Sequence, residues 1–336
     1  MKILNLKQDE IIKIKKLIHE IRCNYDCAIN SVFLNKASLL AGDIPKRIRE
    51  FLLEYKNDEM GEGLCLIKGF PIDDNKIGQT PSHWDYKGSD SPVLETDFLF
   101  VLYSSILGEA FGWSTQQNGK LIHDVLPIKG HENEQLGSSS LELLTWHIED
   151  AFHEYRADYM GLYCLRNHDQ VPTTYASIRD VDLNKIDKEI LFQKRFKIKP
   201  DESHLSKNNK IKNLDFNYIE SLNCNDVHIS ILFGNPNYPY LRLDPYFMDE
   251  LENDKKGQKA LNQIVKVIDS QINDLILTQG DFCFIDNYRV VHGRKPFKAS
   301  FNGKDRWLKR INITRDIRKS SNSRELPYGR NIRQPL

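Results

Sequence analysis

Residues 144–153 have the sequence LTWHIEDAFH, and they hold the most informative pair of side chains in the chain. Residues 143–148 fit a short β-strand, in which alternate side chains point to the same face. His147 and Glu149 would therefore project together, with Ile148 packed behind them. One imidazole and one carboxylate on one face are two of the three protein ligands of a 2-His-1-carboxylate iron site.

This pair is weak evidence for a metal site by itself, because one or two His-x-acid pairs are expected by chance in a chain with ten histidines. The prediction therefore depends on a third ligand. A second such pair, His83 and Asp85, lies in a loop rich in Ser, Gly and Pro, so we rank it below His147. His292 follows a short strand far along the chain, and a rolled-up sheet can bring it to the first pair. An arginine shortly after His292 could hold a carboxylate through two hydrogen bonds.

Short β-like runs separated by turns begin near residue 141 and continue to residue 314. Helical patterns are expected at residues 11–25, 45–55, 182–193 and 260–272, and the apolar run 98–107 fits either a buried helix or a strand. The strands are expected at residues 63–70, 143–148, 159–165, 173–178, 229–233, 240–243, 281–285 and 307–314. The sequence therefore predicts a mainly β protein with added helices in a single domain.

The composition is that of an ordinary globular protein of 336 residues, with 40% hydrophobic and 28% charged residues. Lysine plus arginine equals aspartate plus glutamate at 47 each, so no overall charge favours nucleic acid or an anionic membrane. No apolar stretch approaches the roughly 20 residues that span a bilayer. The six cysteines are scattered, and the N-terminal segment has no apolar signal core, so we expect a cytoplasmic protein.

Several motifs together resemble the clavaminate synthase-like oxygenases, a group that includes hydroxylases of free arginine, asparagine and lysine. The resemblance covers residues 112–315 and implies a double-stranded β-helix (jelly roll) core. The motifs are LTWHIEDAFH at 144–153, YMGL at 159–162, VHGRKPF at 291–297, DRWLKR at 305–310, FGW at 111–113, TQQNG at 115–119 and HDVLP at 123–127. The single domain, 1–336, would have a mixed helical region at 1–95, the core at 96–316 and a tail at 317–336.

The resemblance implies an iron(II), 2-oxoglutarate and O2-dependent oxygenase with three metal ligands, His147, Glu149 and His292. Arg306 would hold the distal carboxylate of 2-oxoglutarate, although it could instead pair with Asp305 on the surface. Thr174 would hydrogen-bond to the same carboxylate, a role that its neighbour Thr173 could fill. Because the oxidant must be kept from the protein itself, a lid is useful, and the polar segment 201–226 is the candidate.

The same resemblance implies an amino-acid site. Arg310 would bind the α-carboxylate, unless it pairs with Asp316. The α-amine would meet three groups, namely Gln116 or Gln117, Ser138 or one of the two serines after it, and Glu149. Asp244 and Tyr246 would contact the end of the substrate side chain, unless Asp244 pairs with Arg242. One carboxylate and one phenol suit a compact ammonium, which predicts hydroxylation of free L-lysine at C4 or C3, with L-arginine second.

Two alternatives from other classes remain open at this stage. A cupin-type hydrolase or isomerase would use the same three ligands with zinc or manganese and would not need Arg306. A non-catalytic β-barrel binding module would keep the histidines as structural residues. For the oxygenase, the expected partner is a free amino acid, with no nucleic acid or membrane, and a homo-oligomer is possible.

Overall fold

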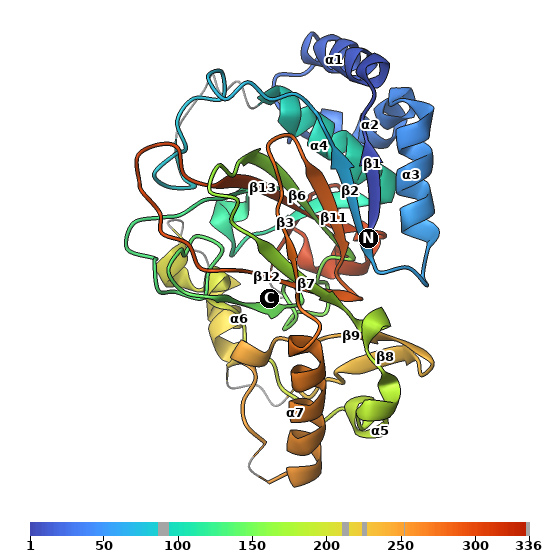
Figure 1. Ribbon diagram of the computed structural model, residues 1–336, viewed down its shortest axis with the longest axis vertical. Helices are drawn as coiled ribbons and strands as arrows, with labels where there is room; N and C mark the ends of the chain where they lie inside the picture. The colour runs from blue at the N-terminus through green and yellow to red at the C-terminus, as the bar shows by residue number, and fades with distance from the viewer. Residues whose placement is uncertain (87–93, 210–214, 224–226, 252, 334–336) are drawn as a thin grey trace.

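Two main β-sheets with helices on their outer sides form the computed structural model, which describes residues 1–86, 94–209, 215–223, 227–251 and 253–333 (Figure 1). This arrangement confirms the predicted combination of sheets and added helices. Residues 210–214 and 224–226 of the predicted lid and residues 334–336 of the predicted tail lie outside the described ranges. Within those ranges, none of the helices has both the length and the apolar character needed to cross a bilayer.

The larger sheet has eight strands in the order β1-β2-β11-β6-β13-β3-β14, and β4 pairs with β13 as well. Its inner strands β11, β6 and β13 are antiparallel to their neighbours, and β13 lies in the interior of the sheet between β6 and β3. The strand bounds are β1 Lys2–Asn5, β2 Leu64–Lys68, β3 Glu109–Trp113, β4 Ile122–Val125, β6 Tyr159–Arg166, β11 Phe282–Asp286, β13 Trp307–Thr314 and β14 Asn331–Ile332.

The smaller sheet has four antiparallel strands in the order β10-β7-β12-β5. His147 at the end of β5 lies directly opposite His292 in β12. This register brings together two histidines that are far apart in the sequence. The bounds are β5 Leu144–His147, β7 Thr173–Ser177, β10 Asn273–Leu275 and β12 Val290–Arg294.

Alternation along the central strands divides the core into two layers. In β6, Tyr159 and Tyr163 join the apolar cluster under the N-terminal helices, whereas Met160, Leu162 and Cys164 join the cluster that lies between the two sheets. This is the period of two that a strand buried on both faces requires. The space between the sheets is therefore enclosed by strand side chains.

Four helices cover the outer face of the larger sheet, at the upper part of Figure 1. They are α1 Gln8–Arg22, α2 Ser31–Leu40, α3 Lys46–Asn57 and α4 Leu94–Leu107. In α1 the buried Ile11, Ile14, Leu17, Ile18 and Ile21 form one apolar stripe. Residues 98–104 of α4 are buried on all sides, which resolves the predicted alternative of helix or strand in favour of a helix.

A second group of elements covers the smaller sheet, at the lower end of Figure 1, with its own apolar cluster. The predicted helix 182–193 is reduced to short turns and α5, and the predicted strand 229–233 begins only at residue 232. The bounds are α5 Lys188–Leu191, α6 Asp215–Leu222, α7 Lys255–Asp269, β8 Leu232–Asn235 and β9 Tyr238–Leu241.

Candidate functional site

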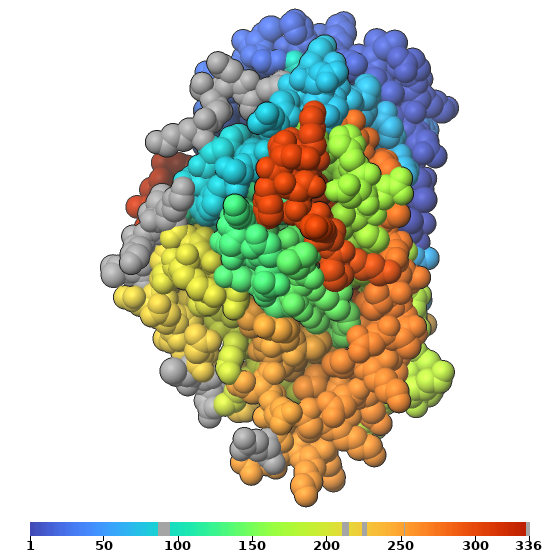
Figure 2. Space-filling view, turned by 60° about the vertical axis from the view of Figure 1, so that its left-hand side comes forward, coloured from blue at the N-terminus to red at the C-terminus, as the bar shows by residue number. Residues whose placement is uncertain are grey.

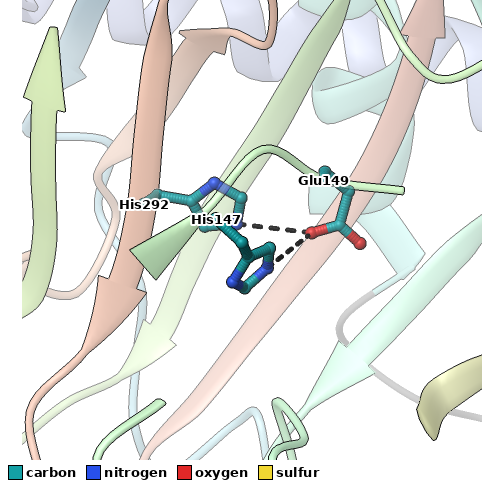
Figure 3. A group of neighbouring side chains, drawn as sticks. All are labelled: His147, Glu149 and His292. Atoms are coloured by element: carbon teal, nitrogen blue, oxygen red, sulfur yellow. Dashed lines mark ion pairs between the residues drawn. The ribbon is translucent and has the colours of Figure 1, made fainter. Parts of the chain in front are cut away.

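Three side chains converge in the space between the sheets (Figure 3). Nε2 of His147 lies 3.6 Å from Oε2 of Glu149, and Nε2 of His292 lies 3.3 Å from the same oxygen. The two imidazole ring centres are 4.7 Å apart. Ile148 is fully buried on the opposite side, as the strand pattern predicts. One ligand atom from each of the three residues lies within 4.8 Å of the others, so the group could hold a metal ion.

Hydrogen bonding orients the first imidazole for such a role. Nδ1 of His147 lies 2.8 Å from the carbonyl oxygen of Thr145 and must donate to it, which leaves Nε2, on the side of Glu149, as the nitrogen that could bind a metal. Burial lowers the pKa of His147, but Glu149 and Asp244 outweigh it and raise the pKa to about 9. Burial lowers the pKa of His292 to about 4. The two histidines therefore differ in charge when no cation lies between them.

Glu149 is ionised although it is buried. Burial raises its pKa, but the guanidinium of Arg310 and the two imidazoles hold the pKa well below its usual range. Arg310 donates from Nη1 to Oε1 of Glu149, and its Nη2 lies 2.8 Å from Nδ1 of His123. The two carboxylate oxygens of Glu149 thus face different partners, Oε1 the arginine and Oε2 the histidines.

Arg306 lines the same cavity and is 5% exposed. Its Nη2 donates to Oγ1 of Thr173 at 3.2 Å, and its buried Nε has no hydrogen-bond partner. No carboxylate of the described residues lies within ion-pair distance of it, and burial lowers its pKa to about 10. Leu162 and Leu308 line the cavity as well. A desolvated guanidinium in apolar surroundings is suited to an anionic ligand.

The threonine that contacts Arg306 is Thr173, the neighbour of the first-choice residue Thr174. Thr173 lines the cavity and contacts Arg306, whereas Thr174 is not among the cavity-lining residues. Successive side chains of β7 point to opposite faces, so only one of two adjacent threonines can reach the cavity. The structure therefore brings Thr173, the alternative given above, to this position.

The predicted substrate residues lie around the mouth of the cavity. Asp244 is 6% exposed, and Tyr246 is 54% exposed at the rim. Burial raises the pKa of Asp244 to about 7, since Asp201 adds to the effect and His147 opposes it only in part. Arg242 does not pair with Asp244, because its Nε and Nη2 donate to the carbonyl oxygens of Ala151 and Phe152. Asp244 thus remains directed into the cavity.

Gln116 and Ser138 line a hollow next to the cavity, with Arg310 at its edge. Nε2 of Gln116 donates to Oγ of Ser203 at 2.7 Å, and Oε1 of Gln116 is buried without a partner. Ser138 lies 2.9 Å from Nδ1 of His131. Gln117 instead bonds to the backbone of Asp124, and this contact distinguishes the two glutamines.

The sequence alone did not identify Asp201 and Ser203, which also line the cavity. They belong to the segment 201–209, coloured yellow-green to yellow in Figure 2, which lies beside the green segment that precedes β5. No periodicity marks this segment, because its residues are held by specific contacts and not by an apolar stripe. Only its unusual length pointed to a function.

The next residue, His204, fixes the segment. Nε2 of His204 lies 2.9 Å from Oδ1 of Asp150, and both side chains are fully buried. Nδ1 of His204 lies 2.8 Å from Oγ1 of Thr115, and Oδ2 of Asp150 accepts from Nε1 of Trp113 at 2.6 Å. Asp150, His204 and Asp201 also lie close enough to share a metal ion. The contacts of Asp150 and His204 are already used within the protein, so this group is structural.

His83 and Asp85 do not join either group of potential metal ligands found in the described ranges. Instead, the backbone N–H of Asp85 donates to Nδ1 of His83. The ranking of His147 above this second pair therefore agrees with the geometry.

Comparisons with known proteins identify relatives of the whole chain. Residues 50–312 match the model of the family described as taurine catabolism dioxygenase TauD, TfdA family. The chain is 40% identical over 331 residues to enduracididine beta-hydroxylase of Streptomyces hygroscopicus, with 96% of each chain covered. It is 36% identical over 340 residues to the L-ornithine/L-arginine 3-hydroxylase of Catenulispora acidiphila, covering 98% of this chain and 99% of the relative.

A crystal structure of the non-heme iron oxygenase OrfP with Fe, succinate and (3S)-hydroxy-L-Arg has a TM-score of 0.94 to this chain. It is 40% identical and covers 99% of this chain and 100% of its own. An L-lysine 4-hydroxylase of Niastella koreensis is more distant, at 31% identity over 291 residues, covering 82% of this chain and 72% of its own.

Proposed function

Because this chain belongs to the TauD/TfdA family, within the clavaminate synthase-like oxygenases of free amino acids, we propose that it hydroxylates C3 of L-arginine or a closely similar amino acid. The chain is a 2-oxoglutarate-dependent dioxygenase that uses iron and O2, which removes the hydrolase and binding-module alternatives. The names of two relatives and the bound molecule of OrfP support C3, since each refers to the β or 3 position.

His147, Glu149 and His292 are the proposed iron ligands. The donor set fits iron(II), because two imidazole nitrogens and one carboxylate oxygen leave positions for other ligands. When bound, iron with 2-oxoglutarate and O2 supplies the oxidising power to hydroxylate an unactivated carbon. The protein contributes orientation: Thr145 fixes the ring of His147, and Arg310 fixes the carboxylate of Glu149.

Arg306 and Thr173 are the proposed anchors of the distal carboxylate of 2-oxoglutarate. A buried guanidinium that lacks a carboxylate partner supports this role, since a ligand carboxylate would satisfy both its charge and its unpaired Nε. Thr173 replaces Thr174 in the proposal because it already contacts Arg306. The leucines around the site exclude water and strengthen the ion pair.

The α-carboxylate of the amino acid is assigned to Arg310, and the α-amine to Glu149, Gln116 and Ser138. Oε1 of Gln116 is a buried acceptor without a partner among the described residues, and an ammonium group would supply the missing donor. Arg310 and Glu149 already lie together, so a zwitterion can pair with both at once.

The end of the substrate side chain is assigned to Asp244 and Asp201. The presence of both carboxylates in the cavity lining is the observation that favours arginine over lysine as the substrate. The lysine prediction depended on a single carboxylate, whereas Asp201 lines the cavity as well as Asp244 and, together with burial, raises the pKa of Asp244. A planar guanidinium has donors on two edges and can satisfy both carboxylates, whereas one ammonium is a compact point charge. Lysine is therefore the second candidate, and Tyr246 at the rim is a minor contact.

The test is to incubate the enzyme with arginine, ornithine or lysine in the presence of iron, 2-oxoglutarate and O2. Mass spectrometry then measures the fraction of each amino acid that has gained one oxygen atom. We expect the highest kcat/KM with arginine, and Asp201→Asn should reduce the preference for arginine over lysine by about tenfold. Glu202→Gln, at the neighbouring position and outside the cavity lining, is the matched control. A higher kcat/KM for lysine than for arginine would restore the original substrate prediction.

The segment 201–226 remains the proposed lid, and its described part carries Asp201 into the cavity while His204 fastens it to Asp150. The two facing sheets of one domain fit the jelly-roll core that the resemblance implies. Cytoplasmic location, a homo-oligomer, and the absence of nucleic-acid and membrane partners stay predictions.

A further inference from the structure

A basic groove of about 540 Å³ lies apart from the catalytic cavity, with which it shares no lining residue. Its walls come from the segment 152–156, the segment 194–199, α6 and the end of β9 with Arg242. We refer to it below as the basic groove. Its volume is in the range of small-molecule sites, and it has no role in the reaction proposed above.

The groove carries an excess of positive charge although the whole chain is neutral. Three lysines and two arginines line it, against the two carboxylates of Glu154 and Asp249. Asp249 is already paired with Lys199, since its Oδ1 lies 2.5 Å from Nζ. Concentration of one sign of charge in a concave site attracts ligands of the opposite sign.

Arg156 at the base of the groove distinguishes it from a solvated charged surface. The residue is 6% exposed, and its guanidinium carbon lies 4.6 Å from the ring centre of Tyr288 and 5.3 Å from that of Phe233. Its Nε is buried without a hydrogen-bond partner. Among the described residues no carboxylate lies within ion-pair distance of it, so only the aromatic rings and the more distant charge of Asp158 offset its desolvation.

A second guanidinium adds to the unbalanced charge. Arg242 uses Nε and Nη2 to bind two backbone carbonyl oxygens, which neutralise no charge. Burial, together with the charge of Arg156, lowers the pKa of Arg242 to about 9, although the carboxylate of Glu154 opposes the shift. Two desolvated cations that repel each other would both be stabilised by an anion between them.

Two other buried arginines of this chain have the carboxylate partner that Arg156 lacks. Arg166 pairs with Asp74 at 2.7 Å, and Arg289 pairs with Asp286 at 2.9 Å. Arg306 lacks such a carboxylate and lies where a ligand carboxylate is expected. Arg294 also lacks a carboxylate contact, but it donates to Oγ of Ser139 and to backbone carbonyl oxygens. Arg156 resembles Arg306 in its burial, its unpaired Nε and its lack of a carboxylate contact among the described residues.

We propose that the basic groove binds a small, multiply charged anion of phosphate or polycarboxylate type, held by Arg156 and Arg242 at its base and by Lys194 at its rim. A single carboxylate would leave most of the positive charge unbalanced, which is why a multiply charged ligand is favoured. The aromatic rings hold the guanidinium of Arg156, which lines the groove. This proposal does not depend on the identity of the amino-acid substrate.

The experiment is calorimetric titration of the full-length protein with pyrophosphate, inorganic phosphate and citrate at low ionic strength. Arg156→Met should weaken pyrophosphate binding by about tenfold or more, because it removes a charge-assisted hydrogen bond. Lys194 is exposed, so Lys194→Gln should leave the fold intact. This variant should weaken pyrophosphate binding about two- to fivefold. Comparison of the three ligands distinguishes phosphate from carboxylate chemistry.

Lys259→Gln is the matched control, because Lys259 is exposed on α7 and lines a surface groove without a buried arginine. It should leave binding unchanged. An equal effect of Lys194→Gln and Lys259→Gln would reduce the interaction to general surface charge and overturn the proposal. Loss of binding in Arg306→Leu would place the anion in the catalytic cavity and overturn it as well, as would no binding of any of the three ligands.

Discussion

Arg310 donates to Oε1 of Glu149, whereas Oε2 of the same carboxylate lies 3.3 Å from Nε2 of His292. Glu149 therefore connects the proposed metal centre directly to the proposed amino-acid site. In the proposed arrangement, a zwitterion that pairs with both Arg310 and Glu149 contacts the residue that also belongs to the metal group.

Loss of either histidine from the metal group should remove the metal. We expect His147→Ala and His292→Ala each to reduce the affinity for Mn²⁺, an iron substitute, by at least about 100-fold, measured by anaerobic calorimetry. His168→Ala is the control, since His168 is exposed and interacts with Asp74 outside the cavity. Unchanged Mn²⁺ binding in both variants would contradict the proposed ligand set.

Arg306→Leu should weaken 2-oxoglutarate binding by about 10- to 100-fold, because it removes a charged hydrogen bond in a buried site. Thr173→Val should weaken it by a few-fold, since a neutral hydrogen bond contributes about 1 kcal/mol. Thr174→Val is matched in chemistry and differs only in the direction of the side chain. Titration of 2-oxoglutarate into each variant decides the assignment, and a larger effect at residue 174 would contradict it.

Arginine binding should depend on pH through Asp244. Burial raises the pKa of this carboxyl to about 7, so in the free enzyme it is protonated below pH 7 and ionised above it. A guanidinium binds the ionised form, so the Kd for arginine should fall as the pH rises from about 5.5 to 7 and level off above. The slope approaches tenfold per pH unit at the acidic end. Asp244→Asn should remove this dependence, and its persistence in the variant would exclude Asp244 as the source.

His204→Leu should release the segment 201–209 from Asp150. Removal of one partner of a fully buried pair leaves the other without compensation and costs about 3–5 kcal/mol of stability. A loosened segment should also allow 2-oxoglutarate to be consumed without substrate hydroxylation. The ratio of succinate to hydroxylated amino acid should therefore rise above one.

Lys207→Gln is the control for this experiment, because Lys207 is exposed on the same segment and pairs with the surface residue Glu202 rather than with Asp150. It should keep the ratio near one. A ratio of one in His204→Leu, measured at a temperature where the variant is folded, would show that the contact between His204 and Asp150 does not serve closure.

The metal group was predictable from the sequence because strand geometry places residues 147 and 149 on one side. The pairing of His147 with His292 could not be derived in this way, since register between distant strands depends on the whole sheet. The resemblance to a known family supplied it. The helix α4 was ambiguous because it is buried on all sides, so its sequence lacks the polar face that reveals a helix.

The remaining differences have local causes. Two adjacent threonines give no indication of which one faces the cavity, so the sequence left Thr173 and Thr174 as alternatives. Asp201 was not identified because its position depends on the burial of His204 three residues later, a contact that leaves no pattern in the sequence. The lysine prediction followed from that omission, since Asp244 was the one carboxylate assigned to the substrate side chain, whereas Asp201 lines the same cavity.

Arg306, Leu308 and Arg310 all line the cavity from β13 or the residue before it, at alternate positions. The two arginines are therefore separated by four residues of strand, or about 13 Å, and the central position of β13 in the sheet keeps that separation constant. Asp201 and Asp244, which are proposed to meet the variable end of the substrate, come from other parts of the chain. Directed evolution of residues 201–209 and 244–247 could therefore yield enzymes for new amino acids while leaving the common carboxylate anchors undisturbed.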